Sequence, residues 1–240
     1  DNITHDDKTS WANYVRGVAW ALADEGYSLT GFDGLIHSTI PFGSGLSSSA
    51  AIEVAIGIVF QMLGEWQMDA VKLALICQKA ENKFVGVNSG ILDQYSSALG
   101  QSGHTLMLDC RHLSHTTARI PEGVSVVICD TRAPRELTGS EYGDRRAQCE
   151  EGVRLLQQFY PDIGHLRDVS PAQFAAHEAD LPEIVARRCR FIIEENRRVL
   201  DLGRALSTND LAEVAQLTAE SYQGARDLYV GIDQRCRADA

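Results

Sequence analysis

The sequence predicts a soluble globular protein of mixed α-helical and β-strand structure, with one large or two modest domains. Its 240 residues are 44% hydrophobic, enough to form real cores. Segments with helical spacing of apolar residues alternate with short, extended apolar runs along the whole chain. The longest apolar stretch, residues 50–63, is interrupted by Glu53 and Gln61 and is shorter than the ~20 residues that a membrane span needs. We therefore expect no membrane association.

Each element follows from local patterns. Residues 49–64 are apolar nearly all round, which predicts a helix buried between a sheet and other helices. Asp69 is a suitable N-cap, residues 138–141 have the form of a capping box, and Ser170-Pro171 is typical of a helix start. The predicted helices are 11–23, 49–64, 69–85, 91–99, 141–160, one from 170, 181–206 and 210–229, and the predicted strands are 35–40, 105–110 and 124–130.

Composition excludes several classes of protein. The net charge of −11 argues against a general nucleic-acid surface. Six widely spaced cysteines without a C-x-x-C pair favour reduced thiols in a cytoplasmic protein over disulfides or zinc. A change of composition near Pro121 predicts two domains, 1–120 and 121–240.

A loop of glycines and serines leads into the apolar helix at 49–64. Glycines have no Cβ, so the backbone can adopt positive φ and approach a ligand closely. The serines add hydroxyl donors where the first N–H groups of a helix lack internal partners, and the helix dipole favours an anion there. The alternative is an ordinary Gly-Ser turn before a core helix. The predicted phosphate-binding residues are Gly43, Ser44, Gly45, Leu46, Ser47, Ser48 and Ser49.

The residue types in the loop exclude two other glycine-rich motifs. A P-loop requires Gly-Lys-Ser/Thr, and no lysine occurs between Lys8 and Lys72. The nucleophile elbow G-x-S-x-G does not occur in the loop either. The loop is therefore neither of these common sites.

Glu81 is a candidate metal ligand. On the helix 69–85 it follows Cys77 by four residues, so its carboxylate leans toward the apolar side. Burying it without a partner would cost several kcal/mol. Either it is exposed or in a salt bridge, or it binds a cation; with the hydroxyl of Ser49 it would form a suitable oxygen pair for Mg²⁺.

Asp93 and Tyr142 are candidate substrate contacts. Asp93 lies in the first turn of a helix, where an aspartate is commonly found without any catalytic role; otherwise it is a base for a substrate hydroxyl, close to Gly90, which lets a small ligand approach the backbone. Tyr142 at the start of helix 141–160 is either a partly exposed aromatic residue or a contact to a sugar.

Five strings of the sequence resemble galactokinases of the GHMP small-molecule kinase family, nearest the bacterial form. The most specific is P-x-G-x-G-L-S-S-S-A-A at 41–51. Their order and spacing cover almost the whole chain. The other four are WANYVRGV at 11–18, QKAENKFVGVNSGILDQ at 78–94, residues 104–111, and GSEYGDRRAQCE at 139–150.

The resemblance implies an α+β, two-domain GHMP kinase fold with the site between the domains. It implies that Gly43 to Ser49 hold the phosphates of ATP, that Ser49 and Glu81 ligate Mg²⁺, that Asp93 accepts or orients the proton of the sugar 1-hydroxyl, and that Tyr142 binds the sugar. The implied reaction converts ATP and α-D-galactose to galactose 1-phosphate and ADP, the entry step of the Leloir pathway. The partners would be ATP and galactose, in a monomer or weak homo-oligomer.

The chain departs from the family pattern at both ends. No segment resembling G-R-x-N-L-I-G-E-H-T-D-Y precedes Trp11, no third glycine-rich motif occurs before Ala240, and RDLYVGI at 226–232 replaces R-D-D-[YF]-E-[VI]. The sequence therefore predicts a GHMP fold incomplete at both ends, with little kinase activity of its own. Two alternatives stay open: a non-catalytic sensor of galactose and ATP, and a kinase for another sugar such as a uronic acid or arabinose.

Overall fold

The computed structural model describes residues 3–42, 45–129 and 140–230, and they form two compact units. The first is drawn from Asp1–Thr117 and Gly123–Thr138, the second from Ala118–Glu122 and Gly139–Ala240. Helices and one small sheet occur together, which confirms the mixed α and β prediction. Among the described residues, no helix has the length and apolarity needed to cross a membrane.

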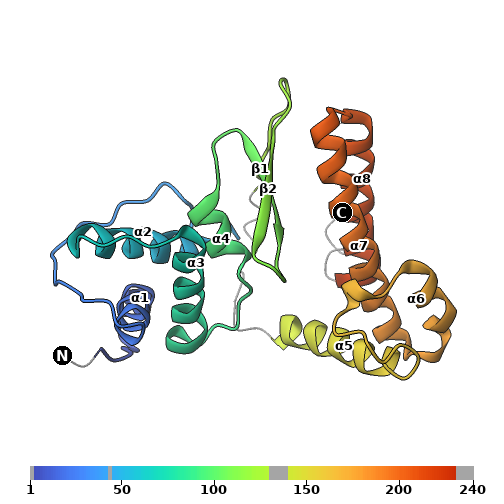
Figure 1. Ribbon diagram of the computed structural model, residues 1–240, viewed down its shortest axis with the longest axis horizontal. Coiled ribbons are helices and arrows are strands. Elements are labelled where there is room, and N and C mark those ends of the chain that lie inside the picture. The colour runs from blue at the N-terminus through green and yellow to red at the C-terminus, as the bar shows by residue number, and fades with distance from the viewer. Residues whose placement is uncertain (1–2, 43–44, 130–139, 231–240) are drawn as a thin grey trace, which may run out of the picture. The chain divides into compact units, whose positions relative to one another are not determined.

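The first unit packs four helices, a π-helical turn and a β-hairpin (Figure 1). Its main core lies among α1, α2 and α3 and includes Leu22, Val54, Phe60, Leu73 and Cys77. Helix α3 begins where Asp69 caps the backbone N–H groups of Val71 and Lys72, as predicted. The elements are α1 (Ala12–Asp24), α2 (Ser48–Leu63), α3 (Ala70–Lys79), the π-helix η1 (Ala80–Val85), α4 (Leu92–Leu99), β1 (His104–Asp109) and β2 (Ser114–Arg119).

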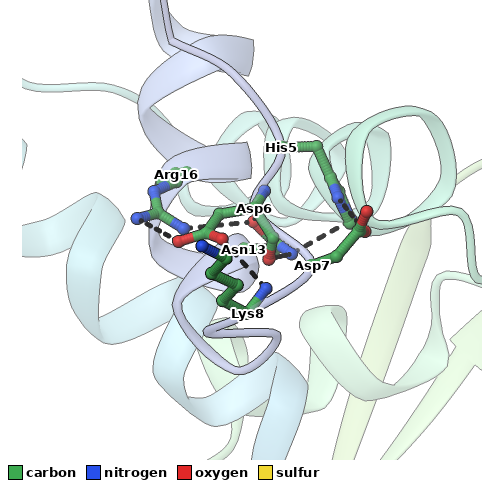
Figure 2. A network of polar contacts seen from close by, with 6 residues as sticks. All are labelled: His5, Asp6, Asp7, Lys8, Asn13 and Arg16. Carbon is green, nitrogen blue, oxygen red and sulfur yellow. Dashed lines mark hydrogen bonds and ion pairs between the residues drawn. The ribbon is translucent and has the colours of Figure 1, made fainter.

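Buried Asn13 fastens the N-terminal segment to α1. Figure 2 shows its amide among the polar groups of residues 5–8. Asn13 Oδ1 accepts a hydrogen bond from the Asp6 N–H at 3.0 Å, and Asn13 Nδ2 donates to the Asp6 carbonyl at 2.9 Å. Arg16 adds an ion pair with the Asp6 carboxylate at 3.2 Å. This segment is therefore held by paired polar groups rather than by apolar burial.

Helix α4 is hydrogen-bonded to the β-hairpin through Tyr95. The hydroxyl of buried Tyr95 donates to the Leu113 carbonyl at 2.8 Å and lies 2.9 Å from His115 Nδ1. The described sheet contains only β1 and β2, so it has two strands.

Two predicted strands were wrong. Residues 35–40 and 124–129 form no strand; Leu35 is 96% exposed and Val127 is 79% exposed, and Asp130 lies outside the described residues. A strand needs a neighbouring strand whose backbone pairs with its own N–H and C=O groups. In the described sheet β1 and β2 pair with each other, and neither segment pairs with them. An apolar run predicts the capacity for a strand but not the presence of its partner.

The expected full burial of α2 was also wrong. Helix α2 packs on α1, α3 and α4, but its outward side, including Ile58 and Met62, is exposed. The predicted helix 69–85 exists, but changes from α to π hydrogen bonding at Ala80.

The second unit is helical (Figure 1). Helices α5 and α7 pack closely at Gly152, where an added Cβ would lie 2.1 Å from Cys189 Sγ. Ser170 and Gln173 form a capping box at the start of α6, as the Ser170-Pro171 pair predicted. The capping box expected at 138–141 begins at Thr138, which lies outside the described residues. The elements are α5 (Ser140–Leu156), η2 (Leu166–Asp168), α6 (Pro171–His177), η3 (Glu178–Asp180), α7 (Glu183–Thr208), α8 (Leu211–Gly224) and the π-helix η4 (Ala225–Val230).

Candidate active site

The start of α2 has the features of an anion site. Gly45 has φ +78°, the positive value that its lack of a Cβ permits. Ser47, the N-cap, is also left-handed (φ 57°), and its side chain makes no capping hydrogen bond. The first intrahelical bond to Ser47 comes from the Ala51 N–H, at 3.0 Å. The N–H groups of the first turn, at Ser48 and Ser49, therefore have no acceptor within the helix.

Gly43 and Ser44, the other predicted members of the phosphate loop, lie outside the described residues. Leu46, Ser47, Ser48 and Ser49 are each partly exposed. The described part of the loop thus reaches solvent, while Ala50 directly after it is buried.

Glu81 is buried in the π-helical turn η1, only 3% exposed. Its Oε2 accepts one hydrogen bond from Ser89 Oγ and another from Gln94 Nε2, the second at 2.8 Å. The sequence left open whether Glu81 is exposed, in a salt bridge or bound to a cation. The structure shows it buried, with neutral hydrogen-bond donors as its partners. π-Helical turns are rare and often occur at functional sites.

A second carboxyl, that of Glu53 on α2, lies in the same cluster. Glu53 and Gln94 are both fully buried, and Gln94 Nε2 donates to Glu53 Oε2 at 3.0 Å. Burial is the main reason that the pKa of Glu53 is raised to about 9; the charge of Glu81 adds to it, and the Gln94 hydrogen bond opposes it. At neutral pH Glu53 is therefore protonated and uncharged.

Tyr14 and Cys77 border these carboxyls. Burial, followed by the charges of Glu81 and Glu53, raises the pKa of the Tyr14 phenol. Burial and the same two charges raise the pKa of the Cys77 thiol. Both side chains are therefore neutral at pH 7, and neither supplies a charge that compensates the carboxylate.

The loop 86–90 is tied to η1 by Asn82. Its side chain donates to the Ser89 carbonyl at 3.2 Å and accepts from the Ser89 N–H at 2.9 Å, and Gln78 Nε2 donates to the same carbonyl at 3.2 Å. Gly86 begins the loop with φ +89°. These bonds fix Ser89, and Ser89 in turn contacts Glu81.

Asp93 lies in the first turn of α4 and is exposed. It directly precedes Gln94, whose amide reaches Glu81. A Cβ added at Gly90 would meet nothing within 4 Å, so there is open space at the backbone two residues before α4. The first turn of α4 therefore presents a carboxylate to solvent next to the buried cluster.

Ser49 is connected to this cluster through α2. It precedes Glu53 by four residues, so the two side chains lie on one face of the helix about 5–6 Å apart. Glu53 is joined through Gln94 to Glu81, which brings the elements that carry Ser49, Glu81 and Asp93 together. Tyr142 belongs to α5 in the second unit, and its side chain lies outside the described residues.

The donor set fits a hard divalent cation. No group of three or more His, Cys, Asp or Glu side chains suited to a metal was found among the residues the structure describes. Mg²⁺ commonly takes only one or two protein carboxylates and fills the remaining positions with waters and phosphate oxygens. The buried Glu81 carboxylate matches that requirement, because a single one of its oxygens accepts the hydrogen bonds from Ser89 and Gln94.

In the sequence, Glu53 was noted only as an interruption of an apolar run, and Gln94 was given no role. A signal was present: a single carboxyl in a helix that is otherwise apolar all round must be buried, and needs a polar neighbour. Only the fold shows that this neighbour is Gln94.

Comparisons with known proteins agree on one family. Residues 13–101 match the GHMP kinases N terminal domain. The chain is 46% identical over 220 residues to a protein of Roseiflexus sp. named galactokinase, and 46% and 44% identical to galactokinases of Chloroflexus aggregans and Chloroflexus aurantiacus. The crystal structure of Lactococcus lactis galactokinase complexed with galactose is similar, with a TM-score of 0.82 and 32% identity.

These similarities extend over nearly all of this chain but only part of each relative. The three sequence matches cover 92–95% of the chain and 56–59% of the relatives. The Lactococcus lactis structure is matched over 97% of this chain and 61% of its own length. The α+β architecture thus corresponds to that of a solved galactokinase over nearly the whole chain, and residues 13–101 are a GHMP kinase N-terminal domain.

Proposed function

We propose that this chain carries the nucleotide-binding part of a galactokinase. The reaction would transfer the γ-phosphoryl group of ATP to the 1-hydroxyl of α-D-galactose, giving galactose 1-phosphate and ADP. The names of the relatives and the galactose complex of the Lactococcus lactis protein support this choice of sugar. The proposal assigns nucleotide binding to residues 1–120 and the second GHMP domain to 121–240.

The observation that carries the proposal is the buried Glu81 carboxylate, surrounded by neutral donors and connected to the open N-terminus of α2. The phosphates would bind to the loop from Gly43 to Ser49, where N–H groups without helical acceptors and the helix dipole favour an anion. Glu81 and Ser49 would hold Mg²⁺. When bound, that ion would neutralise charge on the β- and γ-phosphate oxygens.

Asp93 would accept, or orient, the proton of the sugar 1-hydroxyl. Its exposure at the first turn of α4 leaves the carboxylate accessible to a substrate, and the open space at Gly90 leaves room for one. Tyr142 would contact the sugar. In phosphoryl transfer most of the catalysis comes from positioning and charge neutralisation, so these residues mainly align the acceptor oxygen.

The remaining expectations belong to the same proposal. We place the protein in the cytoplasm, as a monomer or weak homo-oligomer. The five cysteines that the structure describes are free thiols, in keeping with reducing surroundings.

The decisive experiment is the Asp93→Ala substitution, with galactose-dependent ADP release as the readout, by this chain or by a longer protein that carries it. Loss of a general base should lower turnover by about 10²–10⁴-fold. ATP affinity, measured separately by calorimetry, should stay within about twofold, since Asp93 does not belong to the phosphate loop.

Ser97→Ala is the matched control, because Ser97 is an exposed residue of the same helix. Unchanged turnover of the Asp93 variant would move the base elsewhere. A panel of galactose, arabinose and galacturonic acid distinguishes a galactokinase from a kinase for another sugar, and ATP binding without turnover of any of them would favour a sensor.

A further inference from the structure

The proposed reaction gives no task to two fully buried polar residues of the first unit, Glu53 and Gln94. Both have no exposed surface, and they lie on different helices, α2 and α4. Gln94 Nε2 uses its two protons on two carboxyls: Glu53 Oε2 at 3.0 Å and Glu81 Oε2 at 2.8 Å. The Gln94 amide therefore bridges the two acidic side chains.

We propose that Glu53 and Gln94 are positioning residues that fix the Glu81 carboxylate so that its Oε1 faces the metal. Neither residue would touch the ion or the substrates. This inference rests on the proposed function, because it assigns a task to these residues only if Glu81 is a metal ligand.

The first argument is the choice of oxygen. Ser89 Oγ and Gln94 Nε2 both donate to Glu81 Oε2. Two donors on one oxygen fix the orientation of the carboxylate and leave Oε1 for a cation. Hydrogen bonds of this kind orient metal-binding carboxylates in many proteins.

The second argument is the energetic cost of the arrangement. Glu53 Oε1 and Gln94 Oε1 are buried and have no hydrogen-bond partner in the described structure. Stability alone would be served better by two apolar side chains of similar size, which leave no polar atom unpaired. Polar groups retained at such a cost are expected at functional sites.

The third argument is placement. Glu53 follows Ser49 by one helical turn on α2, and Gln94 is the residue directly after Asp93 on α4. The Glu53–Gln94 hydrogen bond therefore connects the helix of one proposed metal ligand to the helix of the proposed base, and Gln94 connects both to the other ligand.

The test measures metal coordination without relying on turnover. Calorimetry gives the affinity of the chain for ATP with Mn²⁺ and for ATP with a chelator, and the ratio of the two is the gain in affinity that the metal provides. The variants are Gln94→Met, the double variant E53M/Q94M and Glu53→Gln. Tryptophan fluorescence on heating checks folding, because all three tryptophans lie in the first unit.

We expect Gln94→Met to reduce the gain provided by Mn²⁺ by about 10–100-fold, the range found when outer-shell partners of metal ligands are removed. E53M/Q94M should reduce it equally while unfolding at the same temperature as the wild type or higher. Glu53→Gln keeps an acceptor for Gln94 and should retain the gain within about twofold. The matched control is Gln61→Met, the same change on α2 outside the cluster, where the side chain accepts from the Met68 N–H at 3.0 Å. It should leave the gain unchanged.

A folded E53M/Q94M variant with the wild-type gain would overturn the inference. Glu81→Ala separates the two levels of the argument. If Glu81→Ala removes the gain and the double variant keeps it, only the positioning role fails. If Glu81→Ala also keeps the gain, the proposed metal site itself fails.

Discussion

The two units bury charge in opposite ways. The first buries the carboxyls of Glu53 and Glu81 among neutral donors. The second buries a cation: Arg188 is 7% exposed and donates to Gln148 Oε1 at 3.0 Å and to the Leu228 carbonyl at 2.6 Å. A guanidinium remains charged at all relevant pH values, whereas a carboxyl can lose its charge by binding a proton. The comparison indicates a structural role for Arg188 and a cluster in the first unit whose charge can change.

Among the variants that should destabilise the protein, the largest effect is expected from removing the fixed cation. Arg188→Met leaves Gln148 and the Leu228 carbonyl without their donor, and should destabilise the second unit by about 2–4 kcal/mol. Urea unfolding followed by far-UV circular dichroism should show the shift, while tryptophan fluorescence, confined to the first unit, should not. Arg197→Met, at an exposed ion pair with Asp201, is the control and should cost no more than about 0.5 kcal/mol. Equal shifts in both signals would mean that the units do not unfold independently.

The close packing of α5 on α7 allows a second test in which only the second unit should change in stability. Gly152→Ala should destabilise the second unit by about 1–3 kcal/mol, since the new methyl group would overlap Cys189 and press on Val185. Gly143→Ala, on the same helix but with nothing within 4 Å, should instead stabilise it by about 0.5–1 kcal/mol. Circular dichroism in urea measures both, and a neutral Gly152→Ala would show that Cys189 can rotate away.

The pH dependence tests the variable charge of the first unit. The folded pKa of Glu53, about 9, lies above its ordinary value of 4.5, so the folded state holds an extra proton between these values. Stability from this group is therefore complete below about pH 4.5 and declines as pH rises toward 9, by up to about 1.4 kcal/mol per pH unit.

Glu53→Gln removes this dependence. The free energy of unfolding of the variant should therefore rise steadily relative to that of the wild type from pH 5 to pH 8. Urea unfolding followed by tryptophan fluorescence at several pH values measures the difference. A difference that does not change with pH would mean that Glu53 is ionised in the folded protein.

The smallest effect is expected from removing a helix cap, and each unit has such a cap. Asp69 caps α3 in the first unit and Asp210 caps α8 in the second, where it accepts from the Glu213 N–H at 3.0 Å. Alanine at either position should cost about 1 kcal/mol. Only Asp69→Ala should alter the fluorescence transition, and a fluorescence change for Asp210→Ala would contradict the independence of the two units.

Helices were predictable because their signals are local. Asp69 and Ser170 start helices where the sequence placed the caps. The strands 35–40 and 124–130 were not predictable, because a strand is stabilised by a neighbour that its own residues do not specify. The change to π hydrogen bonding at Ala80 also lacks a local signal, since the apolar spacing of 69–85 is that of an ordinary helix.

For the candidate site, the sequence indicates residues but not the contacts between them. Motif letters identified Ser49, Glu81 and Asp93, but the role of Glu53 depends on Gln94, 41 positions later in the chain. A polar residue in an apolar helix indicates that a buried partner exists, and only tertiary structure identifies it. The roles of all the candidate site residues, Gly43 to Ser49, Glu81, Gly90, Asp93 and Tyr142, and the domains 1–120 and 121–240 stay predictions.

The proton held by Glu53 also changes the charge of the molecule. The formal count of −11 treats every carboxyl as ionised. With Glu53 protonated, the folded chain carries one negative charge fewer near neutral pH. When the first unit unfolds, Glu53 returns to water and releases this proton. Unfolding therefore acidifies a weakly buffered solution, and the heat measured on unfolding includes the ionisation enthalpy of the buffer that takes up the proton.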